Sequence, residues 1–369
     1  MKILRIFNLN FVPILLIFAI TSCSKNQDAV NGSSNGKDGG LLNNGVVGPS
    51  FDLYFGVSES TNNRSYLKKF YFNSNTNAVS DSLFVQLSYN SELRGLDLDE
   101  NGRVVVANAQ LSNPIEIIDI SSTDSLSIYG NISPSLGTNS GFDTNRNHTI
   151  CVLPNGNKVI GGYNPGNTVY INEYSSGGEF IQNIHSSNHI SFNISMNKCV
   201  SRSNLELYLI EANSSVGGGA KLLRFTRSNI SSSWSLIDSL LDSDFDGLNG
   251  ASGSSFWSFA IDVENSYIYL SRYMDTGTQF KKLVRCPVTG FNASNCVGIG
   301  DDIPSDSRVK SMIVIPGTSG DLLVFTFLPG HTLYRFNVSD GTWTSLFDLT
   351  TMNLGSDSYG QVWAKSILN

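Results

Sequence analysis

From residue 51 onward, apolar residues alternate with polar ones over short stretches, and each stretch ends in small polar residues. Alternation with a period of two is typical of strands with one buried face, and clusters of Asn, Gly, Ser and Asp are typical of hairpin turns. The same hairpin pattern recurs at residues 66–78, 114–125, 168–179, 221–232, 280–291 and 332–343. The pattern therefore predicts an all-β chain built from repeated units.

A second hairpin precedes five of these six. These upstream hairpins lie at residues 93–108, 148–163, 193–210, 257–272 and 310–325. Turns such as DENG, PNGN and GTSG carry the Asn and Gly that positive φ angles require. Each unit then holds four strands, and units of roughly 50 residues are typical of the blades of a β-propeller.

The ends of the chain account for the missing upstream hairpin. The segment 51–60 has no strand before it to pair with, and 359–368 has none after it. If these two segments pair, they complete one more blade from both ends of the chain and remove an open edge. We therefore predict a six-bladed β-propeller over residues 51–369, with a seven-bladed propeller as the alternative.

The stretch GLDLDENGRVVVAN, residues 95–108, resembles the repeats of NHL-type and related propellers. The resemblance covers the repeated region and implies the fold, not an activity.

The N-terminus has the pattern of a targeting segment. Lys2 and Arg5 are followed by an apolar stretch over residues 6–20, which is short for a membrane-spanning helix. Ile20-Thr21-Ser22-Cys23 then resembles the lipobox of bacterial lipoproteins. That resemblance implies a signal peptide over residues 1–22, removed before a Cys23 that carries a diacylglycerol. The alternative is an ordinary cleavage site with an incidental cysteine.

The residue after Cys23 is Ser24, not the Asp that the best-known sorting rule associates with the inner membrane. The resemblance therefore implies a bacterial envelope protein, anchored at the outer membrane by its lipid. Residues 23–50 are rich in Ser, Asn and Gly, and we expect them to form a flexible tether.

The charge of the chain argues against one class of partner. Of its 369 residues only 15% are charged, the formal net charge is −7, and no basic cluster follows the N-terminus. Nucleic-acid binding is therefore not expected.

Four cysteines remain after Cys23, and an even number in an exported protein predicts disulfides. Cys286 and Cys296 fall on the two sides of one hairpin, so we expect them to pair. Cys151 and Cys199 fall near the ends of innermost strands in neighbouring blades, where a second bridge or two buried free thiols are the alternatives.

One acidic stretch predicts a calcium loop. Asp242, Asp244 and Asp246 alternate before Gly247, and the stretch resembles the D-x-D-x-D-G start of calcium loops in EF-hands and integrin-type propellers. By that resemblance the three carboxylates and the Leu248 carbonyl are the ligands of a Ca²⁺ ion.

The rest of this stretch departs from those loops. Gly250 and Gly253 stand where a later acidic ligand is expected. The alternative is a solvated turn whose carboxylates cap the backbone. A similar stretch, Asp97 to Gly102, is interpreted as a hairpin turn because strands flank it closely. His185 and His189 have a zinc-like spacing on a helix, but we expect them in a loop between blades.

Three functions fit these features. The first is a binding, adhesion or scaffold module for a protein or glycan, and the second is a metal-dependent hydrolase of lactonase type. The third is a structural subunit of an envelope assembly. A hydrolase would need acidic ligands at the starts of inner strands. Candidate channel residues are Arg94, Trp257, Arg272, Tyr273 and Trp363, for most of which we favour simple packing or solvated edges.

Overall fold

The computed structural model describes residues 50–59, 64–87, 93–108, 115–120, 125–132, 147–163, 168–188, 194–213, 220–245, 255–273, 282–304, 308–327, 332–348 and 362–368. The predicted signal peptide and tether lie outside these ranges. Residues Val47–Asn369 form one compact unit, and the described strands all belong to it. In the described part of the chain, no helix has the length and apolar character needed to cross a membrane.

The strands form six antiparallel sheets of four, numbered here as blades 1–6 in chain order. Blade 1 holds β24 (Val362–Leu368), β1 (Ser50–Glu59), β2 (Arg64–Asn73) and β3 (Ala78–Gln86). Blade 2 holds β4 (Leu93–Leu98), β5 (Val104–Asn108), β6 (Ile115–Ile120) and β7 (Leu126–Ile132). Blade 3 holds β8 (Asn147–Val152), β9 (Lys158–Tyr163), β10 (Thr168–Tyr174) and β11 (Phe180–Asn188).

The second half of the chain repeats this arrangement. Blade 4 holds β12 (Ile194–Ser203), β13 (Glu206–Asn213), β14 (Lys221–Thr226) and β15 (Ser235–Leu241). Blade 5 holds β16 (Ser255–Asp262), β17 (Tyr267–Tyr273), β18 (Leu283–Pro287) and β19 (Val297–Ile299). Blade 6 holds β20 (Arg308–Val314), β21 (Leu322–Phe327), β22 (Thr332–Phe336) and β23 (Trp343–Asp348).

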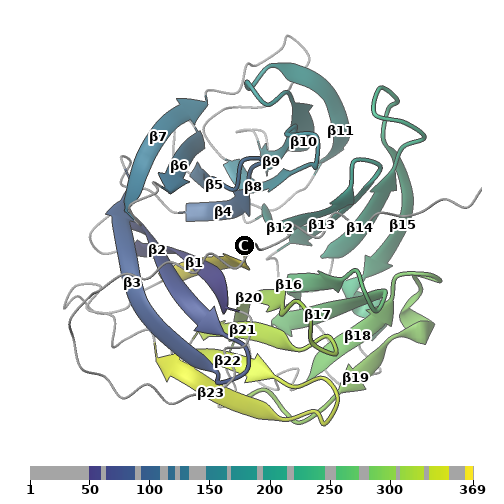
Figure 1. Cartoon of the computed structure of the whole chain (residues 1–369). Helices are drawn as coiled ribbons and strands as arrows, with labels where there is room; N and C mark the ends of the chain where they lie inside the picture. Colours follow the sequence, from purple (N-terminus) through teal and green to yellow (C-terminus); the bar gives the residue numbers. More distant parts are fainter. Residues whose placement is uncertain are drawn as a thin grey trace, which may run out of the picture. The chain divides into compact units, whose positions relative to one another are not determined.

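The innermost strands close a ring around the central axis (Figure 1). Each of β24, β4, β8, β12, β16 and β20 contacts the next, and β20 contacts β24 again. We call these six the inner strands. The six-bladed prediction is confirmed, and the seven-bladed alternative is wrong.

The two ends of the chain share blade 1, as predicted. β24 pairs antiparallel with β1, in a register from Leu53 opposite Leu368 to Glu59 opposite Val362. The last strand of the propeller thus becomes the inner strand of its first blade, and the ring closes through backbone hydrogen bonds.

The hydrophobic core is divided among the interfaces between blades, because alternate residues of a strand point to opposite faces of its sheet. β5 shows this division clearly. Val104 and Val106 pack in a cluster with Tyr54 of blade 1, whereas Val105 packs with Ile160 of blade 3. Middle strands are therefore buried on both faces, which explains uninterrupted apolar runs such as VVVA.

The meander gives the propeller two different ends. The hairpins that join the first strand to the second and the third to the fourth lie at one end, here called the turn end. The remaining connections, including those between blades, lie at the other end, here called the loop end. Inner strands begin at the loop end and finish at the turn end. Most loop-end connections lie outside the described residues.

Candidate functional site

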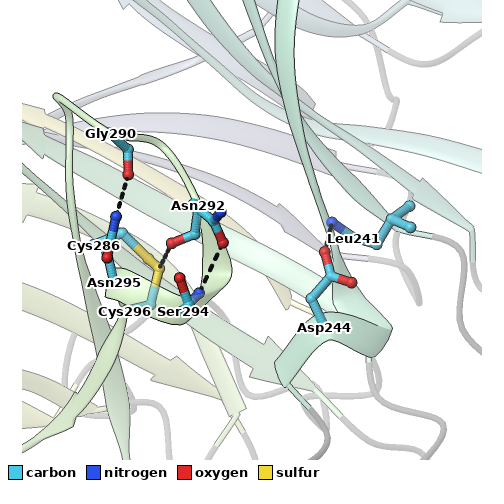
Figure 2. Close-up of a disulfide and its surroundings, with 8 residues drawn as sticks. All are labelled: Leu241, Asp244, Cys286, Gly290, Asn292, Ser294, Asn295 and Cys296. Atoms are coloured by element: carbon cyan, nitrogen blue, oxygen red, sulfur yellow. Dashed lines mark hydrogen bonds between the residues drawn. A yellow bond between two sulfur atoms is a disulfide. The ribbon is translucent and has the colours of Figure 1, made fainter.

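Both predicted disulfides are present. Cys286 at the end of β18 bonds Cys296, which directly precedes β19, with 4.2 Å between their Cα atoms. The turn between them contains the short helix η2 (Ala293–Asn295), and Figure 2 shows its cap, in which Ser294 N donates to Asn292 Oδ1 at 3.0 Å. This bridge closes one hairpin of blade 5.

The second disulfide joins two blades. Cys151 of β8 bonds Cys199 of β12, with 5.5 Å between their Cα atoms. Both side chains are buried. The bridge therefore connects the inner strands of blades 3 and 4, and the alternative of two free thiols is wrong.

The predicted calcium loop begins where the sequence placed it, after the outer strand of blade 4. Asp242–Phe245 form a short 3-10 helix, η1, directly after β15. Asp244 Oδ2 accepts a hydrogen bond of 3.0 Å from Leu241 N (Figure 2). Phe245 is fully buried and packs edge-on against Phe256 at 5.4 Å between ring centroids. Phe245 thus anchors the start of the stretch on blade 5.

The other predicted calcium ligands lie outside what the structure describes, namely the Asp242 side chain, Asp246 and Leu248. Within the described residues, no group of three or more His, Cys, Asp or Glu side chains is placed to hold a metal. The calcium site stays a prediction.

The second acidic stretch is the hairpin turn between β4 and β5. Asp99 Oδ1 accepts from the backbone N–H groups of Asn101 and Arg103 at 2.9 and 2.8 Å, and its Oδ2 accepts from Arg103 Nε at 2.8 Å. Gly102 has a φ of 74°. The Asp99 carboxylate is therefore occupied by its own turn, as an Asp in this position of a hairpin should be.

His185 lies on β11, so the prediction of an interblade loop is wrong for this residue. The polar residues after it continue the outer strand to Asn188, since an edge strand has one exposed face that tolerates Ser and Asn. His185 Nε2 lies 3.5 Å from Glu211 Oε2 of blade 4, whose side chain is 1% exposed. His189 lies outside the described residues.

A cluster of buried polar groups joins blades 3 and 4 at the turn end, and the sequence pattern did not predict it. Arg227 Nη1 donates to both carboxylate oxygens of Glu173, at 3.1 and 2.9 Å. The Glu173 oxygens also accept from Asn157 Nδ2, Gln182 Nε2 and Trp234 Nε1, at 2.8, 2.8 and 2.9 Å. The Arg227 and Glu173 side chains are 0% and 1% exposed.

Other polar groups at the same end also have partners. Arg335 of blade 6 pairs with Asp321 at 2.6 Å and donates to Asn77 Oδ1 of blade 1 at 2.7 Å. Lys158 of blade 3 is buried, which lowers its pKa, and its Nζ donates to the Ser176 carbonyl at 2.9 Å. Arg335 therefore links blade 6 to blade 1, whereas Lys158 bonds to a turn of its own blade. Both contacts give the turn end a structural role.

The inner strands share one irregularity near the loop end. In β4, Leu93 is opposite Asn108 and Gly95 is opposite Ala107, so one extra residue stands between two adjacent partners. The same shift occurs in β8, β12, β16 and β20. The five bulge residues, called here the bulge ring, are Arg94, His148, Asn197, Trp257 and Lys310. The inner strand of blade 1 carries Trp363 at its second position.

The described neighbours of the bulge ring are apolar or small. Where the structure describes the preceding side chain, it is apolar and buried: Leu93, Phe256 and Val309. The following residue is small and buried in four strands: Gly95, Thr149, Ser258 and Ser311. At Gly95 a Cβ atom would lie 2.6 Å from Ile150 N, so packing against blade 3 requires glycine there.

The bulge ring itself has no shared residue type. Its members are two cations, an imidazole, an amide and an indole. Packing therefore restricts the described residues beside the bulges, whereas the bulge residues vary in chemistry. β-Bulges are over-represented next to functional sites, where they redirect a side chain. The outer strands also carry bulges, which increase the twist of each blade.

Carboxylates are scarce on the inner strands. Their described sequences contain two acidic residues, Asp97 and Asp262. Asp97 Oδ2 accepts from Val152 N of blade 3 at 2.7 Å, and Asp262 accepts from the backbone and side chain of Asn265 at 2.9 and 2.7 Å. Both lie toward the turn end. The acidic metal ligands expected at the starts of inner strands are not on these strands.

The other predicted channel residues also lie at the loop end. Arg272 is opposite Phe256 across the first two strands of blade 5, and Tyr273 is the last residue of β17. Arg94, Trp257 and Trp363 lie on three different inner strands. The ring brings residues together that are far apart in the sequence.

Fold and site together define a six-bladed β-propeller with a chemically varied loop end. No family model matches the chain, and no curated protein is similar to it in sequence. Among solved structures, a protein of unknown function from Bacteroides caccae is similar at a TM-score of 0.50 and 13% identity, over 86% of this chain and 99% of that one. The periplasmic gluconolactonase of Pseudomonas aeruginosa is similar at a TM-score of 0.53 and 10% identity, over 81% and 96%. At these identities the likeness shows the fold alone.

Proposed function

We propose that this protein is a non-enzymatic binding module that holds its ligand at the loop end of the inner strands. The observation that carries the proposal is the bulge ring, in which five inner strands place five different residues at one structural position. A position selected by packing alone would hold apolar or small buried residues, as the described flanking positions do, Leu93 and Gly95 among them. Different polar and aromatic residues at one level of a rigid scaffold are typical of a recognition site.

We further propose that the module is a lipoprotein of the bacterial envelope. The support is in the sequence: an apolar segment over residues 6–20, the lipobox-like residues up to Cys23, and a Ser/Asn/Gly-rich stretch to residue 50. A lipid on Cys23 would anchor the chain at the outer membrane, and the tether would hold the propeller away from it. Tethering raises the effective concentration of a binding module at the membrane surface.

A hydrolase of lactonase type is the alternative. The fold is compatible with it, since a periplasmic gluconolactonase is among the similar structures. The donor set is less compatible, because a divalent metal prefers carboxylates. The two acidic residues on the described inner strands serve Val152 N and Asn265 instead. A subunit role in an envelope assembly would instead show as stable co-purification with a partner.

Calcium belongs to the proposal as a stiffener of the loop end, bound by Asp242, Asp244, Asp246 and the Leu248 carbonyl. Support comes from the alternation of the three carboxylates and from the buried Phe245, which fixes one side of the stretch. Thermal unfolding with calcium and with a chelator tests it. We expect calcium to raise Tm in the wild type and in Glu264→Gln, an exposed control, and to have no effect in Asp244→Asn.

The binding function is tested with the detergent-solubilised full-length protein on arrays of glycans and envelope or host-surface proteins. Wild type is compared with Arg94→Gln, Trp257→Ala and the control Arg202→Gln, which removes a cation from the turn end of β12. We expect a ligand whose binding is lost in the two bulge-ring variants and kept in the control. Hydrolysis of gluconolactone at enzymatic rates, unaffected by these variants, would refute the proposal.

A further inference from the structure

The chain enters the propeller at its turn end. Ser50, the first described residue, begins β1 and lies opposite Asn73, where β2 ends and the hairpin to β3 begins. β1 is the second strand of blade 1, because β24 supplies the inner strand. If β1 were the inner strand, the chain would enter at the loop end instead. The closure of the ring therefore decides which end of the propeller the preceding residues join.

The proposed tether keeps this end close to the membrane. A flexible chain of the length of residues 24–49 has a root-mean-square end-to-end distance of roughly 30 Å. A strand of seven residues, such as β24, rises about 23 Å. For the loop end to reach the bilayer, the tether would also have to run along the height of a blade. The propeller therefore meets the membrane more often with its turn end.

Exposed apolar side chains are concentrated at the turn end of blade 4. In the described part of the chain ten large apolar side chains are exposed, and four of them lie here. Leu205 is in the first turn of the blade, Ile230 is in the second turn, and Leu236 and Ile237 begin β15, with exposures of 39–52%. Ile237 is the extra residue of a bulge, so two consecutive apolar side chains are exposed. Such a group of apolar residues is typical of an interaction surface.

The two turns of blade 4 are held in place by their own hydrogen bonds. Arg227 N donates to the Leu205 carbonyl at 3.1 Å, which joins the two turns. Within the second turn, Asn229 Oδ1 accepts from Ser231 N at 2.9 Å. A partner surface would therefore meet an ordered backbone, and contact would cost little conformational entropy.

The charges of the turns single out blade 4. Its turns, residues 204–205 and 227–234, are fully described, and their one charged residue is the buried Arg227. The turns of blades 2, 3, 5 and 6 each carry an exposed carboxylate: Glu100, Glu179, Glu264 and Asp340. Moving a charge out of water into an apolar environment costs much free energy. Blade 4 is therefore the part of the turn end that suits contact with lipid.

We propose that the turn end docks reversibly on the bilayer that holds the lipid of Cys23, through the exposed apolar residues of blade 4. Blade 4 lies opposite blade 1 in the ring of inner strands (Figure 1), so the tether and these residues hold the propeller on two opposite sides. The contact is weak by itself, but the tether makes it intramolecular. When docked, the propeller directs its loop end away from the membrane, and when undocked it stands off on its tether. This inference rests on the proposed lipoprotein and adds the orientation of its binding surface.

The test compares a fluorescent label at the two ends of blade 4 in the full-length lipidated protein. Ser231→Cys carries the label in the second turn, and Ser243→Cys carries it at the loop end, after β15; both positions are exposed. The protein is reconstituted in phosphatidylcholine vesicles with a quencher on the lipid headgroups. We expect quenching at residue 231 to exceed that at residue 243 about twofold or more, because docking brings only residue 231 to the headgroups.

Variants identify what holds the docked state. Leu205→Ser combined with Ile230→Ser should reduce quenching at residue 231 about twofold, because much of the exposed apolar area is lost. Ile128→Ser is the control, since it removes an exposed side chain of β7 in blade 2, and it should change nothing. Phosphatidylglycerol in the vesicles should weaken quenching, and added salt should restore it, because the carboxylates of the other turns are repelled. Circular dichroism and Tm of each variant confirm that the fold is kept.

Vesicle flotation separates the docking from the anchor. If the wild type floats with vesicles and Cys23→Ser does not, the anchor stands whatever the orientation. Equal quenching at the two labels, stronger quenching at residue 243, or quenching unchanged by the loss of Leu205 and Ile230 then overturns the docking alone. If the wild type does not float, the proposed lipoprotein fails and the docking fails with it.

Discussion

Replacement of Glu173 by glutamine should destabilise the propeller more than any other single removal of a charge discussed here. Glu173 lies at the turn end of blade 3 and is 1% exposed, opposite the fully buried Arg227 of blade 4. The substitution keeps the size of the side chain. It removes the negative charge and turns one acceptor oxygen into an NH₂ group.

The magnitude follows from the contacts. Glu173 accepts hydrogen bonds from Asn157, Gln182 and Trp234 as well as two from Arg227. In the variant, an NH₂ group faces donors, and the Arg227 cation stays buried without a counter-charge. Breaking a buried ion pair by removing one partner costs about 3–5 kcal/mol. We expect a loss of that size in the free energy of unfolding.

The measurement is equilibrium denaturation in guanidinium chloride, followed by tryptophan fluorescence. Trp234, one of the four tryptophans, belongs to the cluster and contributes to this signal. Glu206→Gln is the matched control, because Glu206 also contacts two arginines, Arg202 and Arg224, but all three side chains are 14–25% exposed. Partly exposed pairs of this kind contribute roughly 0–1 kcal/mol. A double-mutant cycle with Arg227→Met isolates the pair.

The reasoning would be refuted if Glu173→Gln and Glu206→Gln lost the same free energy. It would also be refuted by a coupling energy between Glu173 and Arg227 below about 0.5 kcal/mol, the limit for independent sites. Either result would mean that water reaches the cluster in solution and screens the charges.

Three further predictions concern the framework. The Cys151–Cys199 and Cys286–Cys296 bridges close loops of 48 and 10 residues, so chain entropy gives them stabilisations of about 4 and about 3 kcal/mol. The free energies of unfolding of the two double-alanine variants should show this order, and the reverse order would contradict it. Gly95→Ala should lower the free energy of unfolding by about 1–3 kcal/mol, because the new Cβ would lie 2.6 Å from Ile150 N. The control Gly130→Ala, whose Cβ would meet no atom within 4 Å, should leave it unchanged. Equal losses in denaturation experiments would contradict this. Burial, with help from Asp262, raises the pKa of Tyr269 to about 12. The wild type should therefore lose stability relative to Tyr269→Phe as pH rises from about 10, the pKa of Tyr in the unfolded chain, to about 12. Parallel curves of unfolding free energy against pH for the two proteins would contradict this prediction.

The fold was predictable because the alternation and the turn residues are local signals that repeat. The pairing of residues 51–60 with 359–368 followed from a count of hairpins, and β1 and β24 pair as that count required. The Cys286–Cys296 disulfide followed from the positions of its cysteines on one hairpin, whereas the positions of Cys151 and Cys199 left a bridge and two free thiols open. In each case a repeating unit turned a local pattern into a position in space.

The polar cluster around Glu173 was not predictable in this way. Its members come from β10, β11, the turn before β9, the turn after β14 and the turn before β15, and lie up to 61 residues from Glu173 in sequence. Nothing in the local pattern distinguishes Glu173 from an exposed strand carboxylate. The position of His185 was mistaken for a related reason, since a polar run after an outer strand has the composition of a loop until its pairing partner is known.

The bulge ring adds a distinction between the two ends of the propeller. At the turn end, the buried charges of Glu173 and Arg227 are paired across blades, so their chemistry is used in holding the ring together. At the loop end, the described flanking positions hold apolar or small buried residues, while the bulge position changes from Arg94 to Trp257. A scaffold held at one end allows the other to vary without loss of the fold. Bulge-ring variants should therefore change binding at nearly constant stability, whereas turn-end variants should change stability first.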